Sequence, residues 1–450
     1  MYNWTMNLPK YIDDILNTIN QAGYEAFVVG GCVRDYLLQR PIHDYDVCTN
    51  ALPEVILQLF DKCIPTGLKH GTITVQSDSL VEITTFRKES EYKDHRHPDS
   101  VCYVDTIEED LSRRDFTINA MAYHPRTGII DPYHGQDDLK NKLIRCVGNP
   151  NQRFREDALR MLRAYRFSAK LGFMIEEETK QSILLNTDLI QYVSIERIVH
   201  ELKEIMQTNP QRIAEMTEVL KTVLPEFDEA LRCSQHNIYH YTDVLHHTLG
   251  AMSHLKPYDE TLSFALLFHD LGKMKVKSTD EKGFDHFYMH AKVGEKIAEE
   301  LCVRLKLTKE QRIWIPFYVA HHDDQFHSKL KTIYKYRVKY GIDEEHLFNL
   351  LKIRACDALA HNEKGKESIQ TVKDFYNFYQ ENKNRCMHLK DLCITGKDVL
   401  ENTNYRGKDI QVALEECLRL CFYKPEMNER DRLIKILRKN KLIHNSNQKE

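Results

Sequence analysis

Short apolar runs alternate with helix-like segments over the first third of the chain. Residues 26–29 (AFVV), 44–48 (DYDVC), 72–75 (TITV) and 81–86 (VEITTF) have the β-branched or alternating character of strands. The segment CVRDYLL, which follows a pair of glycines, is typical of a helix. This mixture predicts an α/β domain in the first part of the chain.

After about residue 150 the pattern becomes that of helices. From EDALRMLRAYRFSAKLGF onward, apolar residues recur at spacings of three and four, and strand signals nearly vanish. We therefore predict that residues 150–450 are almost entirely helical. Residues 87–100 (RKESEYKDHRHPDS) show no apolar period, which predicts a mobile charged loop.

Composition narrows the class of protein without deciding it. The length of 450 residues suggests two to four domains, and the formal net charge is only −4. A nucleic-acid partner stays open, because phosphate contacts need only a local basic surface. Twelve cysteines without a close CxxC pair argue against a zinc ribbon or a disulfide scaffold. With no recognisable signal peptide and no bilayer-length apolar stretch, we expect a cytoplasmic protein without a membrane partner.

A glycine pair stands between the first predicted strand and the helix after it. Gly30 and Gly31 let the backbone approach a ligand closely, and a helix N-terminus offers free N–H groups to a triphosphate. Arg34 would add positive charge. Taken alone, the alternative is an ordinary turn.

The next element carries paired carboxylates. Residues two apart on a strand point to the same face, so we expect Asp44 and Asp46 to lie side by side. Mg²⁺ prefers a few carboxylates plus phosphate oxygens, and a two-metal site can activate a hydroxyl and neutralise leaving pyrophosphate. Glu82, on a later strand, is the candidate third carboxylate. The alternative is an exposed strand edge with no ligand.

Several long motifs in one order resemble a known family. The series GGCVRD, DYD, SRRDFTINAMAY (112–123) and REDALRMLRAYRF (155–167) looks like the class II tRNA nucleotidyltransferases, the CCA-adding enzymes. The resemblance runs from about residue 9 to about residue 205. It implies a polymerase-β-like head with a small mixed sheet over residues 1–150 and a helical neck over 151–225.

The RRDFTIN motif has both a functional and a structural interpretation. By resemblance, Asp115 and Asn119, with Arg113 and Arg114 nearby, contact the ribose and phosphates of a nucleotide. Arginine and aspartate close together on a helix commonly just pair with each other, and Arg113 or Arg114 is open to that role.

The motif that starts the neck predicts how a base is chosen. Asp157 and Arg160 are three apart on a predicted helix, hence neighbours on one face. A carboxylate accepts from the exocyclic amine of cytosine or adenine, but meets lone pairs on uracil and guanine. In the family, the matching residues serve as this template. Arg163 and Arg166 continue the helix, and Arg163 is expected at phosphates. The alternative for Asp157 and Arg160 is a surface ion pair.

A short motif further along is expected to be structural. The segment SIERIVHEL (194–202) resembles the last neck motif, and Glu196 and Arg197 are expected to brace the template helix.

Histidines concentrate between residues 236 and 362. The order His, His-Asp, Asp suits one divalent metal bound by imidazoles and carboxylates from several helices, although a lone histidine is usually core or surface. We assign this site to His247, His269, Asp270 and Asp357. Two further candidates, His290 and His321 (or His322), would suit a second metal.

The histidine-rich stretch resembles the HD phosphohydrolase superfamily. The resemblance implies an HD-type helical body over residues 226–380, followed by a helical tail over 381–450. We expect a transition metal such as Mn²⁺, Ni²⁺ or Co²⁺, and activity on nucleotides or 2′,3′-cyclic phosphates.

Together the two resemblances predict Mg²⁺-dependent, template-independent addition of C, C and A from CTP and ATP to the 3′ end of tRNA. Three alternatives remain. The enzyme could add only A, it could be a poly(A) polymerase, or it could be chiefly an HD-type hydrolase with a vestigial head. The intact Asp44, Asp46, Asp157 and Arg160 argue against the last.

Overall fold

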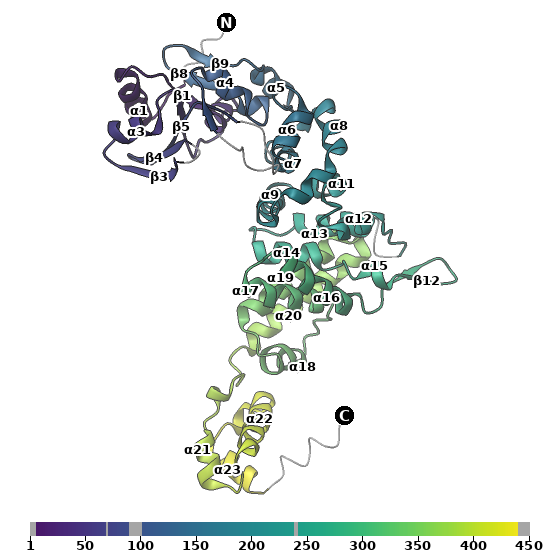
Figure 1. The fold of residues 1–450 in the computed structure, drawn as a ribbon. Coiled ribbons are helices and arrows are strands. Elements are labelled where there is room, and N and C mark those ends of the chain that lie inside the picture. The colour runs from purple at the N-terminus through teal and green to yellow at the C-terminus, as the bar shows by residue number, and fades with distance from the viewer. Residues whose placement is uncertain (1–5, 69–70, 90–100, 238–241, 440–450) are drawn as a thin grey trace. The chain divides into compact units, whose positions relative to one another are not determined.

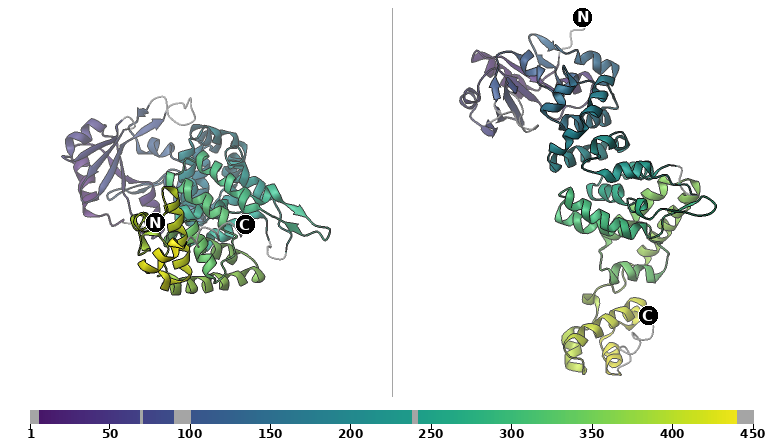
Figure 2. Two further views of the ribbon diagram at one scale, coloured as in Figure 1. Left: turned by 90° about the horizontal axis from the view of Figure 1, so that it is seen from below. Right: turned by 45° about the vertical axis from the view of Figure 1, so that its right-hand side comes forward.

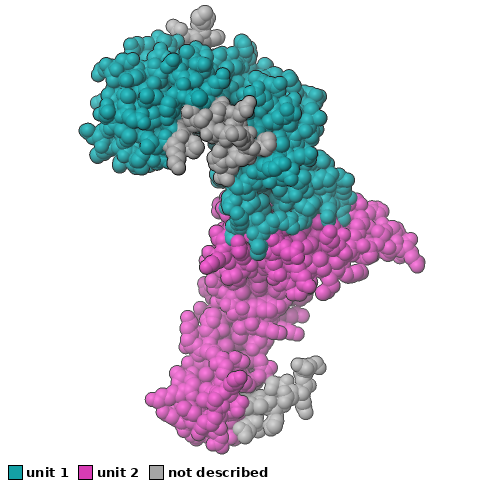
Figure 3. Space-filling view, viewed as in Figure 1, with its two compact units in different colours: residues 1–233, 303–307 teal, residues 234–302, 308–450 magenta. Residues whose placement is uncertain are grey.

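The computed structural model describes residues 6–68, 71–89, 101–237 and 242–439 (Figure 1). The chain forms two compact units (Figure 3), one of residues 1–233 with 303–307 and the other of 234–302 with 308–450. A mixed-sheet domain opens the first unit and helices make up nearly all that follows, which confirms the predicted fold class. The finer division into head, neck, body and tail stays a prediction.

The head is built on one mixed sheet with strand order β3-β4-β5-β2-β1-β8-β9. Its strands are β1 (Ala26–Val29), β2 (Asp46–Thr49), β3 (Cys63–Gly67), β4 (Thr72–Gln76), β5 (Leu80–Thr85), β8 (Ala122–His124) and β9 (Gly128–Ile130). The helices beside it are α1 (Lys10–Gln21), α2 (Gly31–Leu37), α3 (Pro53–Leu59), α4 (Ile107–Ser112), the 3₁₀ turn η2 (Thr117–Asn119) and α5 (Gly135–Asn141).

Both faces of β1 are buried, which explains its unbroken apolar sequence. Phe27 and Val29 join a core cluster with Cys48 of β2 and with Leu111 of α4. Strand β2 pairs antiparallel with β1 and parallel with β5. Residues opposite one another share a face, so the face of this cluster also carries Asp46, which stands opposite Val29.

Two strand predictions need correction. Strand β2 begins at Asp46, so Asp44 lies in the irregular segment before it rather than on the strand. The start of the predicted loop 87–100 is a strand, because β6 (Arg87–Glu89) pairs with β7 (Val101–Tyr103). The rest of that segment, residues 90–100, lies outside the described residues.

The neck continues the first unit as helices. They are α6 (Pro150–Glu156), α7 (Leu159–Leu171), α8 (Glu177–Leu185), the 3₁₀ helix η3 (Thr187–Tyr192), α9 (Ile195–Thr208), α10 (Arg212–Glu215), α11 (Thr217–Leu220) and α12 (Pro225–Arg232). The two-residue strands β10 (Leu143–Ile144) and β11 (Met174–Ile175) pair in parallel at its start.

Where the structure describes it, the second unit has helices and one small hairpin of β12 (Ser278–Thr279) and β13 (Asp285–His286). Its helices are α13 (Val244–Ser253), α14 (Glu260–Phe268), α15 (Lys273–Val276), α16 (His290–Arg304), α17 (Lys309–His321), α18 (Leu330–Ile333), the π-helix η4 (Tyr334–Lys339), α19 (Glu344–Ala360), α20 (Glu363–Asn382), the 3₁₀ turn η5 (Leu389–Asp391), α21 (Gly396–Asn402), α22 (Lys408–Tyr423), the 3₁₀ turn η6 (Pro425–Met427) and α23 (Arg430–Arg438). Among the described helices, none combines the length and the apolarity needed to cross a membrane.

A pair of glycines lets α16 lie against the turn after α14. A Cβ placed on Gly272 would stand 2.6 Å from the amide nitrogen of Gly294 and would collide with the carbonyl of His290. A Cβ on Gly294 would meet Val319 at 3.1 Å. The glycine of the LGK sequence is therefore required by backbone packing next to the histidine cluster.

We predict that Gly272→Ala lowers the free energy of unfolding of the second unit by about 3 kcal/mol, because backbone atoms cannot move aside as a flexible side chain can. Gly250→Ala in α13 is the matched control, since its Cβ would meet only Ala360 at an ordinary 3.6 Å. Thermal unfolding followed by circular dichroism should show a lower transition for the first variant alone. Equal midpoints for the two variants would contradict the prediction.

Candidate functional sites

Two carboxylates face each other across neighbouring strands of the head. Asp46 of β2 and Glu82 of β5 are partners in the parallel pairing, so they lie side by side on one face, and both are exposed. The pKa of Asp46 is raised above its ordinary value, chiefly by burial, although part of its side chain reaches solvent. Arg114 lowers this pKa, and the nearby charges of Glu82 and Asp44 raise it. Asp44 is therefore close enough to act on Asp46, although it lies outside the strand.

This donor set fits a divalent cation. Asp44, Asp46 and Glu82 offer only oxygen ligands, and their mutual repulsion is the kind that a bound cation removes. Asp46 and Glu82 thus lie side by side, Asp44 is within electrostatic reach of Asp46, and their role as ligands stays a prediction.

Arg114 packs closely against the glycine turn beside the carboxylates. Gly30 has a φ of +80°, and a Cβ there would lie 2.8 Å from an Nη of Arg114. Gly31 begins helix α2. Only glycine fits position 30, both for its left-handed backbone and for the space that the guanidinium occupies.

Arg113 and Arg114 share one buried partner. Arg113 donates from Nε and Nη2 to Asp110 at 3.0 and 2.9 Å, and Arg114 lies 3.4 Å from the other carboxylate oxygen. Asp110 has no exposed surface, and although burial raises its pKa, the two guanidinium groups bring the pKa below its usual range. Both arginines therefore form ion pairs within the protein, and their contact with a nucleotide stays a prediction.

Asp115 connects the head to neck helix α7. Arg163 donates to one carboxylate oxygen at 2.8 and 2.6 Å, and Asn119 donates to the other at 3.2 Å. Asn119 in turn accepts from Arg34 at 2.6 Å. Burial raises the pKa of Asp115, but Arg163 and the hydrogen bonds outweigh it and bring that pKa down to about 2.

Three arginines predicted to bind the nucleotide, Arg34, Arg163 and Arg166, are engaged within the protein. Arg34 is buried and forms two hydrogen bonds with Asp35, each 2.9 Å long. Arg166 lies 3.1 Å from the buried Glu201. The guanidinium groups of Arg34, Arg163 and Arg166 all lie within 5.4 Å of the centre of the Phe167 ring, so one aromatic side chain organises three cations.

The expected geometry of the template pair is wrong. Asp157 ends α6 with an extended backbone (φ −143°, ψ 104°), and Arg160 is in the first turn of α7, so the two do not share a helix face. Asp157 accepts from Arg197 at 3.2 and 2.7 Å, whereas Arg160 donates to Glu156 at 2.7 Å. The chain breaks between the two helices at Asp157 without a proline or glycine to signal it.

Glu196 and Arg197, both expected to brace the template helix, have different partners. Arg197 holds Asp157, whereas Glu196 is exposed and pairs with Lys306 at 2.6 Å. Arg197 also lines a pocket of about 340 Å³ together with Arg163 and His200. Asp157 itself does not line this pocket and is related to it through Arg197, which contacts both.

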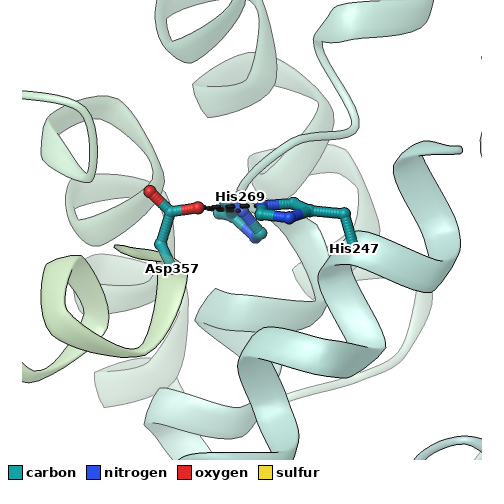
Figure 4. A group of neighbouring side chains, drawn as sticks. All are labelled: His247, His269 and Asp357. Atoms are coloured by element: carbon teal, nitrogen blue, oxygen red, sulfur yellow. Dashed lines mark hydrogen bonds and ion pairs between the residues drawn. The ribbon is translucent and has the colours of Figure 1, made fainter. Parts of the chain in front are cut away.

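The second unit gathers histidines and aspartates at one buried point. His247 Nε2 lies 2.9 Å from Asp357 Oδ1, and His269 Nε2 lies 3.5 Å from the same oxygen (Figure 4). Asp270 Oδ2 lies 3.3 Å from His269 and 3.6 Å from His247. All four predicted residues are thus brought together from α13, from the turn after α14 and from α19.

The histidine rings are held as metal ligands usually are. His269 Nδ1 lies 2.6 Å from the carbonyl of Leu266, and His322 Nδ1 lies 2.7 Å from that of Val319. Donation to a carbonyl fixes the tautomer and leaves Nε2 as a ligand facing the cluster. His269 Nε2 is fully buried without a hydrogen bond of good geometry. These residues fit a divalent metal with mixed nitrogen and oxygen donors.

Of the candidates for a second metal, the structure brings His290 to the cluster but not His321. His290 Nε2 lies 3.5 Å from Asp270 Oδ1, in the cluster. His321 instead bonds Asp324 at 2.8 Å, and its neighbour His322, 3.6 Å from Asp270, faces the other histidines. Helix α17 ends at His321. The direction of the backbone at this end sets whether His321 or His322 points toward the cluster.

Sequence reasoning missed three polar residues around the cluster. Lys273 Nζ lies 2.7 Å from Asp270, Arg354 donates to Asp357 at 2.8 Å, and His361 Nε2 lies 3.6 Å from Asp357. Lys273 and Arg354 are three residues from an aspartate, which is the one signal that could have found them. All three line a pocket of about 850 Å³ that reaches the cluster.

Three family models match the chain. They are described as the poly A polymerase head domain (residues 26–145), the probable RNA and SrmB-binding site of polymerase A (172–231) and the HD domain (238–402). The CCA-adding enzyme of Oceanobacillus iheyensis is 51% identical over 194 residues, which are 43% of this chain and 48% of that protein. That of Lactobacillus delbrueckii subsp. bulgaricus is 51% identical over 192 residues, 42% of this chain and 48% of the relative. The chain spans about half the length of the curated relatives it matches.

Solved structures extend the likeness to the whole chain. The Bacillus stearothermophilus CCA-adding enzyme in complex with CTP is 26% identical, covers 98% of this chain and 100% of its own, and has a TM-score of 0.72. Along its whole length the chain is therefore similar to a CCA-adding enzyme. The Thermotoga maritima CCA-adding enzyme complexed with tRNA shares the fold, with a TM-score of 0.60 over 96% of this chain and 97% of that one, at 20% identity.

The matches to the head and RNA-binding models and to CCA-adding enzymes confirm the predicted resemblance for the head and neck, and the HD match confirms it for the histidine-rich stretch. Both domains are of metal-dependent kinds, and the residues above supply plausible ligands for each.

We predict that Asp115→Asn destabilises the first unit in a pH-dependent way. The pKa of Asp115 is about 2 when folded, against about 3.9 in an unfolded chain, so its ion pair stabilises fully above pH ~4 and that contribution is lost as the pH falls through about 2. The substitution should lower the free energy of unfolding by roughly 2 kcal/mol near pH 7 and by progressively less below pH ~4.

Urea unfolding at several pH values tests this, with Asp137→Asn, an exposed carboxylate on α5, as the control. A loss that is the same at neutral pH and near pH ~2 would exclude the ion pair as its cause.

Proposed function

We propose that this chain adds C, C and A from CTP and ATP to the 3′ end of tRNA. The observation that carries the proposal is the pairing of β2 with β5, which sets Asp46 opposite Glu82 beside Arg114 and the glycine turn. The stretch that is 51% identical to CCA-adding enzymes supports it. The B. stearothermophilus relative that is similar over the whole chain was solved with CTP.

The reaction forms one phosphorus–oxygen bond and breaks another. The 3′-oxygen of tRNA attacks the α-phosphorus, the bond to the β-phosphate breaks, pyrophosphate leaves, and the hydroxyl proton is released. Asp44 and Asp46, with Glu82 beside them, would hold Mg²⁺. When bound, such ions favour the ionised 3′-hydroxyl and offset the charge that develops on pyrophosphate. The Gly30–Gly31 turn leaves room for phosphates to approach the backbone.

Base choice is proposed to depend on the Asp157 carboxylate. Arg197 fixes the plane of this carboxylate through two hydrogen bonds and also lines the neighbouring pocket with Arg163 and His200. An amine of cytosine or adenine would donate to this carboxylate, whereas the oxygens of uracil and guanine would face it with lone pairs. Arg160, held by Glu156, would need to exchange that partner to donate to ring acceptors.

We propose that the HD domain is a phosphohydrolase acting on nucleotides or 2′,3′-cyclic phosphates. In such a step, water adds to phosphorus, an ester bond breaks, and the leaving oxygen takes the proton. His247, His269, Asp270 and Asp357 would hold a transition metal such as Mn²⁺, Ni²⁺ or Co²⁺, which promotes attack by water when bound. Lys273 and Arg354 would stand near the anionic substrate. The twelve free cysteines suit a reducing compartment, and we place both activities in the cytoplasm.

We expect the two activities to be separable by substitution. Asp46→Asn should reduce nucleotide addition about a thousandfold and leave phosphate ester hydrolysis unchanged, because it removes a ligand from the head alone. His269→Ala should do the reverse. The assay supplies CTP and ATP singly and together to tRNAs that end at the discriminator base, at C and at CC.

Each outcome of that assay assigns the enzyme to one class. Growth of the shortest tRNA to CCA establishes full addition, whereas extension of only the CC-ending tRNA by A shows an A-adding enzyme. No extension by wild type, with hydrolysis that depends on His269, would leave the chain chiefly a hydrolase.

We expect Asp157→Asn to weaken base choice rather than chemistry. An amide donates as well as accepts, so uracil O4 gains a partner, and the ratio of kcat/KM for CTP over UTP should fall at least tenfold. Asp188→Asn, at an exposed carboxylate of the neck, is the control. An unchanged CTP preference in Asp157→Asn would remove Asp157 from the template.

A further inference from the structure

The β12–β13 hairpin projects from the helices around it in Figure 1 and in both views of Figure 2. Two aromatic side chains at this hairpin are exposed, Phe284 at 37% and Tyr288 at 74% of their surface. Leaving such large rings in water is unfavourable, so exposed rings beside a pocket favour a ligand that covers them.

The rings form preassembled stacks. The ring planes of His286 and Tyr288 are 3° from parallel with their centres 5.5 Å apart, and those of His236 and Phe284 are 19° from parallel at 5.8 Å. Asp280 bonds His286 Nε2 at 2.9 Å, which holds the first stack in orientation. A stack that is already ordered loses little conformational entropy when a third planar group joins it.

These rings share one pocket with the buried histidine cluster. Phe284, His286 and Tyr288 line the same pocket of about 850 Å³ as Asp270 and Asp357. The aspartates are buried and Tyr288 is exposed, so the cluster forms the floor and the ring lies at the mouth. A phosphate at the floor would therefore leave the rest of the substrate beside an aromatic surface.

We propose that Tyr288, stacked on His286, is a platform for a nucleobase, so that the HD site selects phosphate esters of nucleosides over esters without a base. This inference rests on the proposed phosphohydrolase. Stacking on an aromatic face accepts any base, because every base has a π-face. The platform thus gives preference for nucleosides as a class and no preference among A, C, G and U.

The test compares Tyr288→Ala with Tyr288→Phe, which keeps the ring, and with Lys282→Ala, which removes only an exposed charge from the same hairpin. With Mn²⁺, Tyr288→Ala should raise KM for adenosine 2′,3′-cyclic phosphate about tenfold and leave kcat/KM for glycerol 1,2-cyclic phosphate unchanged. Tyr288→Phe and Lys282→Ala should match wild type on both.

A binding measurement separates the platform from the hydrolase. Calorimetric titration of adenosine 2′-monophosphate into the full chain with EDTA should show about tenfold weaker binding to Tyr288→Ala at the second unit, while binding at the head is common to all variants. If wild type hydrolyses neither ester but this difference persists, the hydrolase is wrong and the platform stands. Equal affinities of wild type and Tyr288→Ala, or equal use of both esters by wild type, would overturn the platform.

Discussion

One buried carboxylate, Asp115, holds three sequence motifs together. It accepts from Arg163 of the neck and from Asn119, and Asn119 accepts from Arg34 of the glycine-turn helix. Because each member would leave buried polar groups unpaired if another were lost, the head and the start of the neck are ordered as one polar network. A buried ion pair is weak evidence for stability, but it is strong evidence for a defined geometry when every partner is satisfied.

The register of two strands then decides the chemistry of the head. Side chains alternate between faces, so a shift of one residue between β2 and β5 would move Glu82 away from Asp46. The cost of placing like charges side by side is partly offset by Arg114, which also fills the space that any side chain at position 30 would need. The carboxylates, the arginine and the glycine are therefore one arrangement, and none of the three can be changed without affecting the others.

Sequence patterns predicted the sheet and helices well where burial alone decides them. The AFVV and TITV runs lie on strands β1 and β4, and beyond residue 150 the regular structure of the described residues is helical apart from three two-residue strands. They failed where tertiary contacts decide. Asp157 breaks a helical pattern in order to meet Arg197, forty residues away. Choosing between adjacent His321 and His322 needs the direction in which α17 ends, and periodicity cannot supply it.

The two candidate metal sites of the chain differ in ligand chemistry, and that difference has a physical consequence. The head offers carboxylate oxygens at an accessible surface, which suits Mg²⁺, a hard cation that keeps several waters and shares substrate phosphates. The second unit offers imidazole nitrogens with carboxylates in a buried cluster, which suits transition metals that bind nitrogen strongly. A site made only of carboxylates discriminates poorly against metals that bind more tightly than Mg²⁺. A site with preoriented imidazoles, in contrast, selects transition metals over Mg²⁺. The Nδ1 contacts to the carbonyls of Leu266 and Val319 are therefore as important to the second site as the Nε2 atoms that would meet the metal, because they set the rings before any metal arrives.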